Sequence, residues 1–301
     1  MKDQADKLRA MALNLRQQIE TEIMSNKTTR VIVIASGKGG VGKSTLAVNL
    51  SLYLCQLGYK VVLMDADLGM ANIDIMLGLI PEYNLYDIIC SQKTIQDIMI
   101  DGPQGLKIIP GGSGIQELAN LQEGELKYII YEMGKLDGDF DFLIVDTGAG
   151  ISSNVLNFLL AGDETIIVTT SEPTSLTDAY GTVKSVHRSG FKGRIYLVVN
   201  QVSREAEGLA VAHKFQLVAK RFLQLDVEVL GHIVYDPQVN RVIMEQEPLV
   251  QTFPGSLAAQ NIVNIAQKLV QDDQQQEVRE KAKSKGIRAF FKKFISLNRS
   301  Q

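Results

Sequence analysis

The stretch VIVIASGKGGVGKST, from Val31 to Thr45, constrains the fold of this chain more than any other stretch. It opens with β-branched apolar residues, which predict a strand buried on both faces, as in a parallel sheet. A glycine-rich turn follows, and a helical run begins at Lys43. Strand, glycine turn and helix in this order predict an α/β fold, in which ligands bind at the carboxyl ends of the strands.

The turn fits the pattern G-x-x-x-x-G-K-[ST], which ends here in Lys43 and Ser44. Its glycines can adopt positive φ, so that backbone N–H groups surround an anion. Lys43 can reach the β- and γ-phosphates of a nucleotide, and the Ser44 hydroxyl can bind Mg²⁺. The alternative is a glycine turn with a surface lysine. The predicted ATP-binding loop consists of Gly37, Lys38, Gly39, Gly40, Val41, Gly42, Lys43, Ser44 and Thr45.

Lys38 is unusual, because a second lysine just after the first glycine is not needed to hold one nucleotide. The sequence KGGVGKS, from Lys38 to Ser44, resembles the deviant Walker A motif of the MinD/ParA class of P-loop ATPases. That resemblance implies ATP and Mg²⁺ as ligands and a homodimer that forms with ATP. It also implies that Lys38 reaches the partner's phosphates, whereas the alternative is a solvated loop lysine.

Aspartates follow two further strand-like runs. The segment DADLGMANID follows the run VVLM and begins at Asp65, and FLIVDTGAG places Asp146 at the tip of another strand. The resemblance implies that Asp67 orients the attacking water, that Asp65 lies near the Mg²⁺ shell and that Asp146 holds Mg²⁺ through water. The alternative for Asp65 and Asp67 is a helix N-cap. The predicted catalytic residues are Lys38, Lys43 and Asp67, and the predicted metal ligands are Ser44, Asp65 and Asp146.

Two more strand-like runs, TIIVTT and IYLVVN, complete a predicted doubly wound α/β fold. We expect a mostly parallel sheet of about seven or eight strands with helices on both faces. Asn200 closes the second run, and its amide offers the donor and acceptor that an adenine edge requires. It matches the base-reading asparagine of the class, although an asparagine that caps a turn is the alternative. The resemblance assigns Asp236 and Pro237 to the other side of the base pocket.

The chain as a whole fits one large domain with terminal extensions. It has 301 residues, 45% of them apolar, and no long linker rich in proline or serine. We place the ATPase domain at residues 31–271, between extensions 1–30 and 272–301, the latter opening with a polar linker, DDQQQ. Its two cysteines, Cys55 and Cys90, are not spaced for zinc or a disulfide. Without a signal peptide or a long apolar run, the sequence predicts a cytosolic protein, unless it binds a membrane surface.

The C-terminal segment GIRAFFKKFISL, from Gly286 to Leu297, has the pattern of an interfacial helix. Its basic residues include Arg288, and the segment from Arg279 to Gln301 carries a net charge of +7, which leaves −10 for the rest. Such a helix can lie on an anionic membrane. The alternatives are a last helix packed on the protein's own surface and a helix for a protein partner. The predicted membrane residues are Ile287, Phe290, Phe291, Lys292, Lys293, Phe294 and Ile295.

The first 30 residues predict an amphipathic helix that begins with DQADKLR, followed by a short linker, SNKTT, from Ser25. This opening, the DTGAG loop and the amphipathic tail together resemble the FlhG family (also called YlxH or FleN) of MinD-like ATPases, which help to set flagellar number and placement. The family implies an ATP-bound dimer on the cytoplasmic face of the membrane. Its partners are the FlhF GTPase, which the opening stimulates, and flagellar switch proteins of the C-ring. The residues that match the activating motif are Asp3, Gln4, Ala5, Leu8 and Arg9.

Other functions of the same class stay open. A ParA-type DNA segregation ATPase would bind DNA through basic residues of the body, which the charge of −10 does not favour. We therefore expect no specific nucleic acid as a partner. A MinD-type regulator of the cell-division site, an iron–sulfur carrier with paired cysteines and an adaptor that binds ATP without hydrolysis are the remaining alternatives.

Overall fold

The computed structural model describes residues 28–67, 72–111, 122–276 and 285–299. Eight strands form one sheet in the order β3-β4-β2-β5-β1-β6-β7-β8. Every neighbouring pair is parallel except β3 and β4, which run antiparallel at one edge. The predicted mostly parallel α/β sheet is therefore confirmed. The strands are β1 Arg30–Ser36, β2 Val61–Ala66, β3 Ile100–Asp101, β4 Lys107–Ile109, β5 Phe142–Ala149, β6 Glu164–Thr170, β7 Arg194–Val202 and β8 Glu228–Val234.

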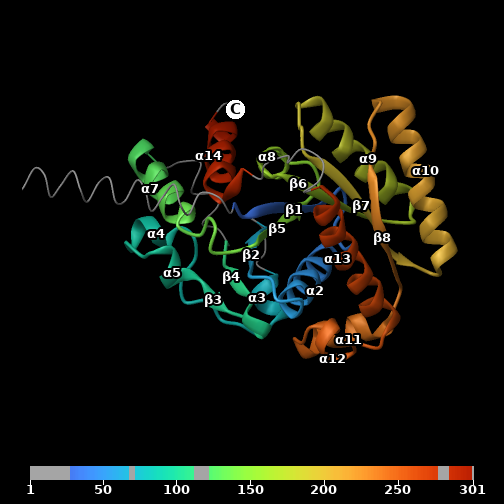
Figure 1. Ribbon diagram of the computed structural model, residues 1–301, viewed down its shortest axis with the longest axis horizontal. Coiled ribbons are helices and arrows are strands. Elements are labelled where there is room, and N and C mark those ends of the chain that lie inside the picture. The colour runs from blue at the N-terminus through green and yellow to red at the C-terminus, as the bar shows by residue number, and fades with distance from the viewer. Residues whose placement is uncertain (1–27, 68–71, 112–121, 277–284, 300–301) are drawn as a thin grey trace, which may run out of the picture.

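Helices cover both faces of this sheet (Figure 1). The central strand β1 is buried along its whole length, and its side chains alternate between two apolar clusters. Val31 and Val33 join the cluster that includes α8, α9 and α14, whereas Ile32 and Ile34 join the one that includes α2 and α13. The helices are α2 Lys43–Gln56, α3 Ile73–Met76, α4 Asp87–Cys90, α5 Ile95–Ile98, α7 Glu123–Gly134, α8 Ser153–Ala161, α9 Pro173–Arg188, α10 Glu205–Leu223, α11 Pro237–Glu245, α12 Leu249–Thr252, α13 Leu257–Gln276 and α14 Gly286–Arg299, with a 3-10 turn at Pro103–Gly105.

The order of the strands gathers the predicted site at one edge of the sheet. β1 lies between β5 and β6, and β5 also pairs with β2, so three strand ends with candidate residues are neighbours. In the register of β2 and β5, Asp65 lies directly opposite Asp146. The carboxyl ends of β1, β2 and β5 thus form the crevice where doubly wound sheets bind ligands.

The helix α13 runs further than the sequence predicts. It extends from Leu257 through Gln276, so the residues DDQQQ from Asp272 are helical and not the expected linker. Glutamine has good helix propensity, and the apolar face of α13 packs on the sheet, which nucleates the helix for the polar residues that follow. Within the described residues, no helix is long and apolar enough to cross a membrane.

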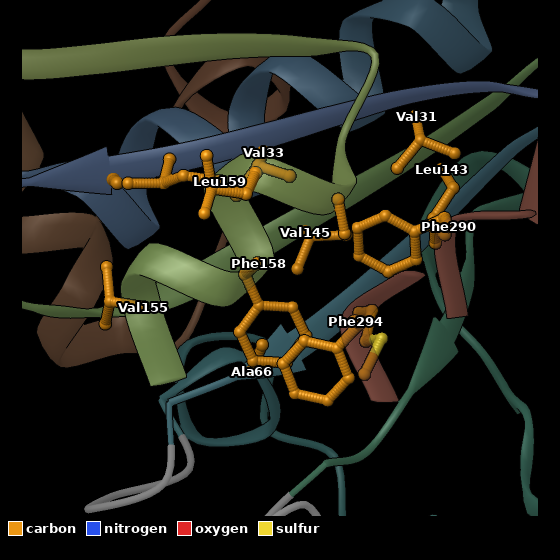
Figure 2. Packing of buried hydrophobic residues seen from close by; sticks show 14 of the residues in the cluster. Val31, Val33, Ala66, Leu143, Val145, Val155, Phe158, Leu159, Phe290 and Phe294 are labelled. Atoms are coloured by element: carbon orange, nitrogen blue, oxygen red, sulfur yellow. The ribbon is translucent and has the colours of Figure 1, made fainter. Parts of the chain in front are cut away.

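The helix α14 forms as predicted, but the structure buries the face expected to meet a membrane. Five of its apolar residues are at most 8% exposed and belong to the protein's own core, namely Ile287, Phe290, Phe291, Phe294 and Ile295. The rings of Phe294 and Phe158 of α8 stack, with their centroids 4.0 Å apart. Figure 2 shows the two side chains together. In this conformation the alternative of a self-packed last helix holds, because α7 and α8 present an apolar groove that covers this face. Lys292 is exposed, while Lys293 is half-buried and donates a hydrogen bond to the carbonyl of Leu160.

Candidate nucleotide site

The loop between β1 and α2 uses its glycines in two different ways. Gly40 and Gly42 have φ of +77° and +85°, the left-handed conformation that the sequence predicts. Gly37 and Gly39 do not adopt positive φ. Gly37 is required for a different reason, since a Cβ there would lie 2.3 Å from the backbone of Asp178 in α9. The loop therefore needs both a left-handed turn and a close approach to α9.

Lys43 and Asp146 form the buried centre of the site. The Lys43 Nζ lies 2.6 Å from Asp146 Oδ1, and the two side chains are 7% and 0% exposed. Burial raises the pKa of the Asp146 carboxyl, although the Lys43 ammonium and the Ser44 hydroxyl oppose that rise. The second oxygen, Asp146 Oδ2, is buried without a hydrogen-bond partner among the described residues. An orphaned carboxylate oxygen beside the Ser44 hydroxyl fits a hard cation such as Mg²⁺ and its waters.

Asp65 organises the segment that follows β2. Its carboxylate accepts hydrogen bonds from the backbone N–H groups of Asp67 at 3.0 Å, Asn72 at 2.9 Å and Ile73 at 3.2 Å. Burial raises the pKa of Asp65 to about 6, while these donors lower it and the nearby charge of Asp146 raises it. Asp65 thus holds both ends of this segment beside the metal position. Most of the lone pairs of its carboxylate already accept hydrogen bonds from the backbone.

Asp67 lies against the carboxyl end of β5. Its Oδ1 would be 3.4 Å from a Cβ placed on Gly148, so glycine at 148 allows the carboxylate to come close. The side chain of Asn72 donates to Asp67 Oδ2 at 3.5 Å. The segment after β2 and the carboxyl end of β5 therefore meet at Asp67, where a water-positioning carboxylate can respond to both.

Lys38 points away from this buried centre. Its Nζ lies 2.7 Å from Glu172 Oε2, and Thr174 Oγ1 accepts a longer hydrogen bond at 3.4 Å. The Lys38 side chain is 43% exposed, in contrast to 7% for Lys43. Sequence reasoning missed Glu172, although the sequence SEPTS around it is typical of a helix start with an acidic residue beside Pro173.

Asn200 sits beside the nucleotide loop but is engaged with the protein. Its Nδ2 donates to the Val41 carbonyl at 2.7 Å, and its Oδ1 accepts from the Gln201 backbone N–H at 2.9 Å. Gln201 has φ of 57°, and its side-chain amide donates to the Gly40 carbonyl at 3.2 Å. Sequence reasoning missed Gln201, and no signal in the sequence marks it. The end of β7 therefore braces the loop, and base reading by Asn200 stays a prediction.

Asp236 and Pro237 occupy the start of α11. Asp236 is the N-cap and accepts a hydrogen bond from the Gln238 backbone N–H at 2.9 Å, with Pro237 at the first helical position. This is a structural role that the sequence analysis did not assign to them, and their contact with a base stays a prediction. The predicted GTPase-activating residues Asp3, Gln4, Leu8 and Arg9 lie outside the described residues.

Fold and site together define a P-loop ATPase of the MinD/ParA class. A family model described as ParA, NUBPL iron-transfer P-loop NTPase, matches residues 27–270. The structure of MinD from Pyrococcus horikoshii complexed with Mg-ADP is similar, with a TM-score of 0.66 and 29% identity over 84% of this chain and 99% of that one. Proteins of this class hydrolyse ATP, and the chain is an ATPase.

Within the class, the chain belongs to the FlhG (YlxH/FleN) family. It is 37% identical to the antiactivator FleN of Pseudomonas aeruginosa over 240 residues, which are 80% of this chain and 86% of FleN. It is 35% identical to the flagellum site-determining protein YlxH of Helicobacter pylori over 269 residues, which are 89% of this chain and 90% of YlxH. The chain is thus an ATPase regulator of the MinD/ParA class.

Proposed function

We propose that this ATPase is a switch that forms a homodimer with Mg²⁺ and ATP and regulates flagellar number or placement from the cytoplasmic face of the membrane. The observation that carries the dimer is the exposed Lys38 ammonium. Among the described residues it bonds an exposed carboxylate and a hydroxyl, whereas Lys43 already serves the phosphate site. A cation at the rim of a phosphate site is suited to the phosphates of a second copy.

Membrane association requires that α14 leaves its groove. Its buried apolar face contributes about 1.5 to 3 kcal/mol for each large side chain, so release costs on the order of 10 kcal/mol before the membrane offsets it. The helix α8 offers a route for this coupling, since the loop from Gly150 to Ser152 joins β5 directly to it and its Phe158 stacks on Phe294. A change in the loop on ATP binding would therefore act on the groove.

The partners of the switch follow from the family. The similarity to FleN, an antiactivator, and to YlxH, a flagellum site-determining protein, supports a flagellar role. We extend this to stimulation of the FlhF GTPase by residues 1–24 and to binding of C-ring switch proteins. Gln4 has a neutral amide that can orient an attacking water, as GTPase glutamines do.

Light scattering after size exclusion tests the dimer. In ADP the chain should elute as a monomer of about 33.2 kDa, and in a non-hydrolysable ATP analogue with Mg²⁺ as a dimer. Lys38→Ala should bind the analogue and remain a monomer, because the charge for the partner's phosphates is lost. A normal dimer of Lys38→Ala would refute the role of this lysine.

GTP hydrolysis by FlhF tests the N-terminal segment. A peptide of residues 1–24 should stimulate turnover, and the same peptide with Gln4→Ala should bind FlhF without stimulating it. The unsubstituted peptide and a scrambled one provide the controls. If Gln4→Ala stimulates fully, the segment acts by docking alone and the proposed role of the amide fails.

A further inference from the structure

The N-terminal end of the described chain and the start of α14 meet at one loop, residues 135–141. Thr29 donates a hydrogen bond from Oγ1 to the Phe140 carbonyl at 2.8 Å and accepts one from the Gly138 N–H at 3.1 Å. In the same loop, the Asp137 carboxylate accepts hydrogen bonds from the N–H groups of Ile287 at 2.7 Å and Arg288 at 3.0 Å. The N-terminal segment is therefore tethered at the end of the groove in which α14 begins.

Release of α14 exposes two apolar surfaces, and a membrane covers only one of them. The helix can insert its own face, but the groove keeps its apolar lining. Phe158 is 1% exposed with α14 in place, and Phe290 and Phe294 are among its neighbours (Figure 2). An uncovered apolar groove of this kind favours association and aggregation, so a second occupant is required.

We propose that residues 8–23 of the same chain are that second occupant and fill the groove when α14 leaves it. This inference rests on the release of α14 in the proposed function. The segment carries apolar residues at three- and four-residue steps, namely Leu8, Met11, Leu15, Ile19 and Ile23. As a helix it would span roughly 24 Å, close to the roughly 21 Å of the 14-residue α14. Residues 24–28 can bridge up to roughly 16 Å to Thr29.

Two features favour α14 over the N-terminal segment as the occupant of the groove. Asp137 and Asp163 accept hydrogen bonds from backbone N–H groups at the start of α14, at Ile287 and Lys285, which is where a helix favours negative charge. The N-terminal segment would enter from the same end and run antiparallel to α14, so its last carbonyls would face these carboxylates. Its aliphatic side chains also fill less volume than the phenylalanines of α14. The tether keeps the segment at high effective concentration, so it binds once α14 has gone.

One consequence concerns the GTPase-activating residues. Leu8 belongs both to the proposed groove-binding face and to the motif that begins at Asp3. The segment cannot pack Leu8 in the groove and present it to a partner protein at the same time. Release of α14 therefore withdraws the activating segment, and docking of α14 makes it available.

Hydrogen exchange of the full-length chain tests the proposal without membrane or nucleotide. In Phe290→Glu with Phe294→Glu, two charges keep α14 out of the groove, and amides of residues 8–23 should exchange at least tenfold more slowly than in the unsubstituted chain. Lys292→Glu is the matched control, since it adds a negative charge to α14 at an exposed position and should leave that exchange unchanged. Adding Leu8→Glu and Leu15→Glu to the double variant should abolish the protection.

A second variant reaches the same state without new charge in the groove. Gly286 has φ of +77°, and a Cβ there would lie 2.5 Å from Asp137 Oδ1, so Gly286→Val should loosen α14. If circular dichroism shows that the double variant is unfolded, hydrogen exchange of Gly286→Val tests the proposal in its place. Unchanged, fast exchange of residues 8–23 in a folded variant with released α14 would overturn the proposal, as would protection that appears only in concentration-dependent dimers. Because no vesicles are present, failure of membrane binding would leave this result standing.

Discussion

The ammonium of Lys38 lies 2.7 Å from the carboxylate of Glu172, although the two residues are 134 positions apart in the chain. Both side chains are exposed, so water screens the pair and its contribution is below about 1 kcal/mol. In this ion pair, Glu172 holds the Lys38 ammonium, which the proposed dimer needs for the phosphates of the second copy. Glu172→Gln should therefore leave nucleotide affinity unchanged and tighten the ATP-dependent dimer by up to about fivefold. Sedimentation velocity measures this, and a dimer weakened by Glu172→Gln would show that the carboxylate supports the dimer.

Asp67→Ala should separate ATP hydrolysis from ATP binding. Removing a carboxylate that orients the attacking water should lower turnover by about 100-fold or more, while ATP affinity changes by no more than a few-fold. Phosphate release and fluorescent-nucleotide titration measure the two quantities. Asp74→Ala, which removes a nearby carboxylate on α3, should retain turnover. Hydrolysis at the parental rate in Asp67→Ala would assign the water to another residue.

Phe158→Ala and Phe294→Ala should have similar effects on stability and different effects on membrane binding. Each removes one ring of the same stacked pair, so each should lower the free energy of unfolding or of α14 docking by about 3 to 5 kcal/mol. Phe158→Ala weakens the groove but leaves the tail intact, so sedimentation with anionic vesicles should increase even without ATP. Phe294→Ala removes part of the inserting face and should bind more weakly than Phe158→Ala. Equal binding of both variants, at the level of the unsubstituted chain, would contradict the release of α14.

Gly37→Ala and Gly39→Ala should differ, although both lie in the nucleotide loop. A Cβ at 37 would overlap the Asp178 backbone, whereas a Cβ at 39 would meet only the Ala149 side chain at 4.0 Å. We expect Gly37→Ala to cost about 1 to 3 kcal/mol in stability and to weaken ATP binding, and Gly39→Ala to do neither. Urea denaturation with and without nucleotide measures both. Equal stabilities would mean that α9 moves away at little cost.

The thiol of Cys55 should react slowly with labelling reagents, and its rate of labelling should depend strongly on pH. Burial raises the pKa of its thiol to about 11, so only about one molecule in a thousand carries the reactive thiolate at pH 8. In Cys90→Ser, labelling of Cys55 by Ellman's reagent should rise about tenfold per pH unit between pH 8 and 10. The exposed Cys90, tested in Cys55→Ser, should react at least about 100-fold faster at pH 8. Fast labelling of Cys55 at neutral pH would favour a chemical role for it, such as the carriage of metal.

The sequence alone determined the sheet and the position of the nucleotide loop, because both depend on short-range patterns. Runs of β-branched residues specify buried strands, and a strand, a glycine turn and a lysine form a phosphate loop within fifteen residues, from Val31 to Thr45. The sequence also placed Asp65 and Asp146 at the carboxyl ends of parallel strands, which share one edge of the sheet, whereas their direct opposition in the register of β2 and β5 came from the structure.

Only the tertiary structure decided the partners of residues distant in the chain. Sequence did not show that Glu172 pairs with Lys38 or that α9 requires Gly37, because each depends on how separate elements pack. The apolar face of α14 shows the difference most clearly. Helical periodicity shows that a face avoids water, but a bilayer and a protein groove are both apolar, so the pattern cannot distinguish them. The groove between α7 and α8, which includes Phe158, is formed by residues far from α14 in the chain. Its presence determines that the apolar face of α14 packs on the protein.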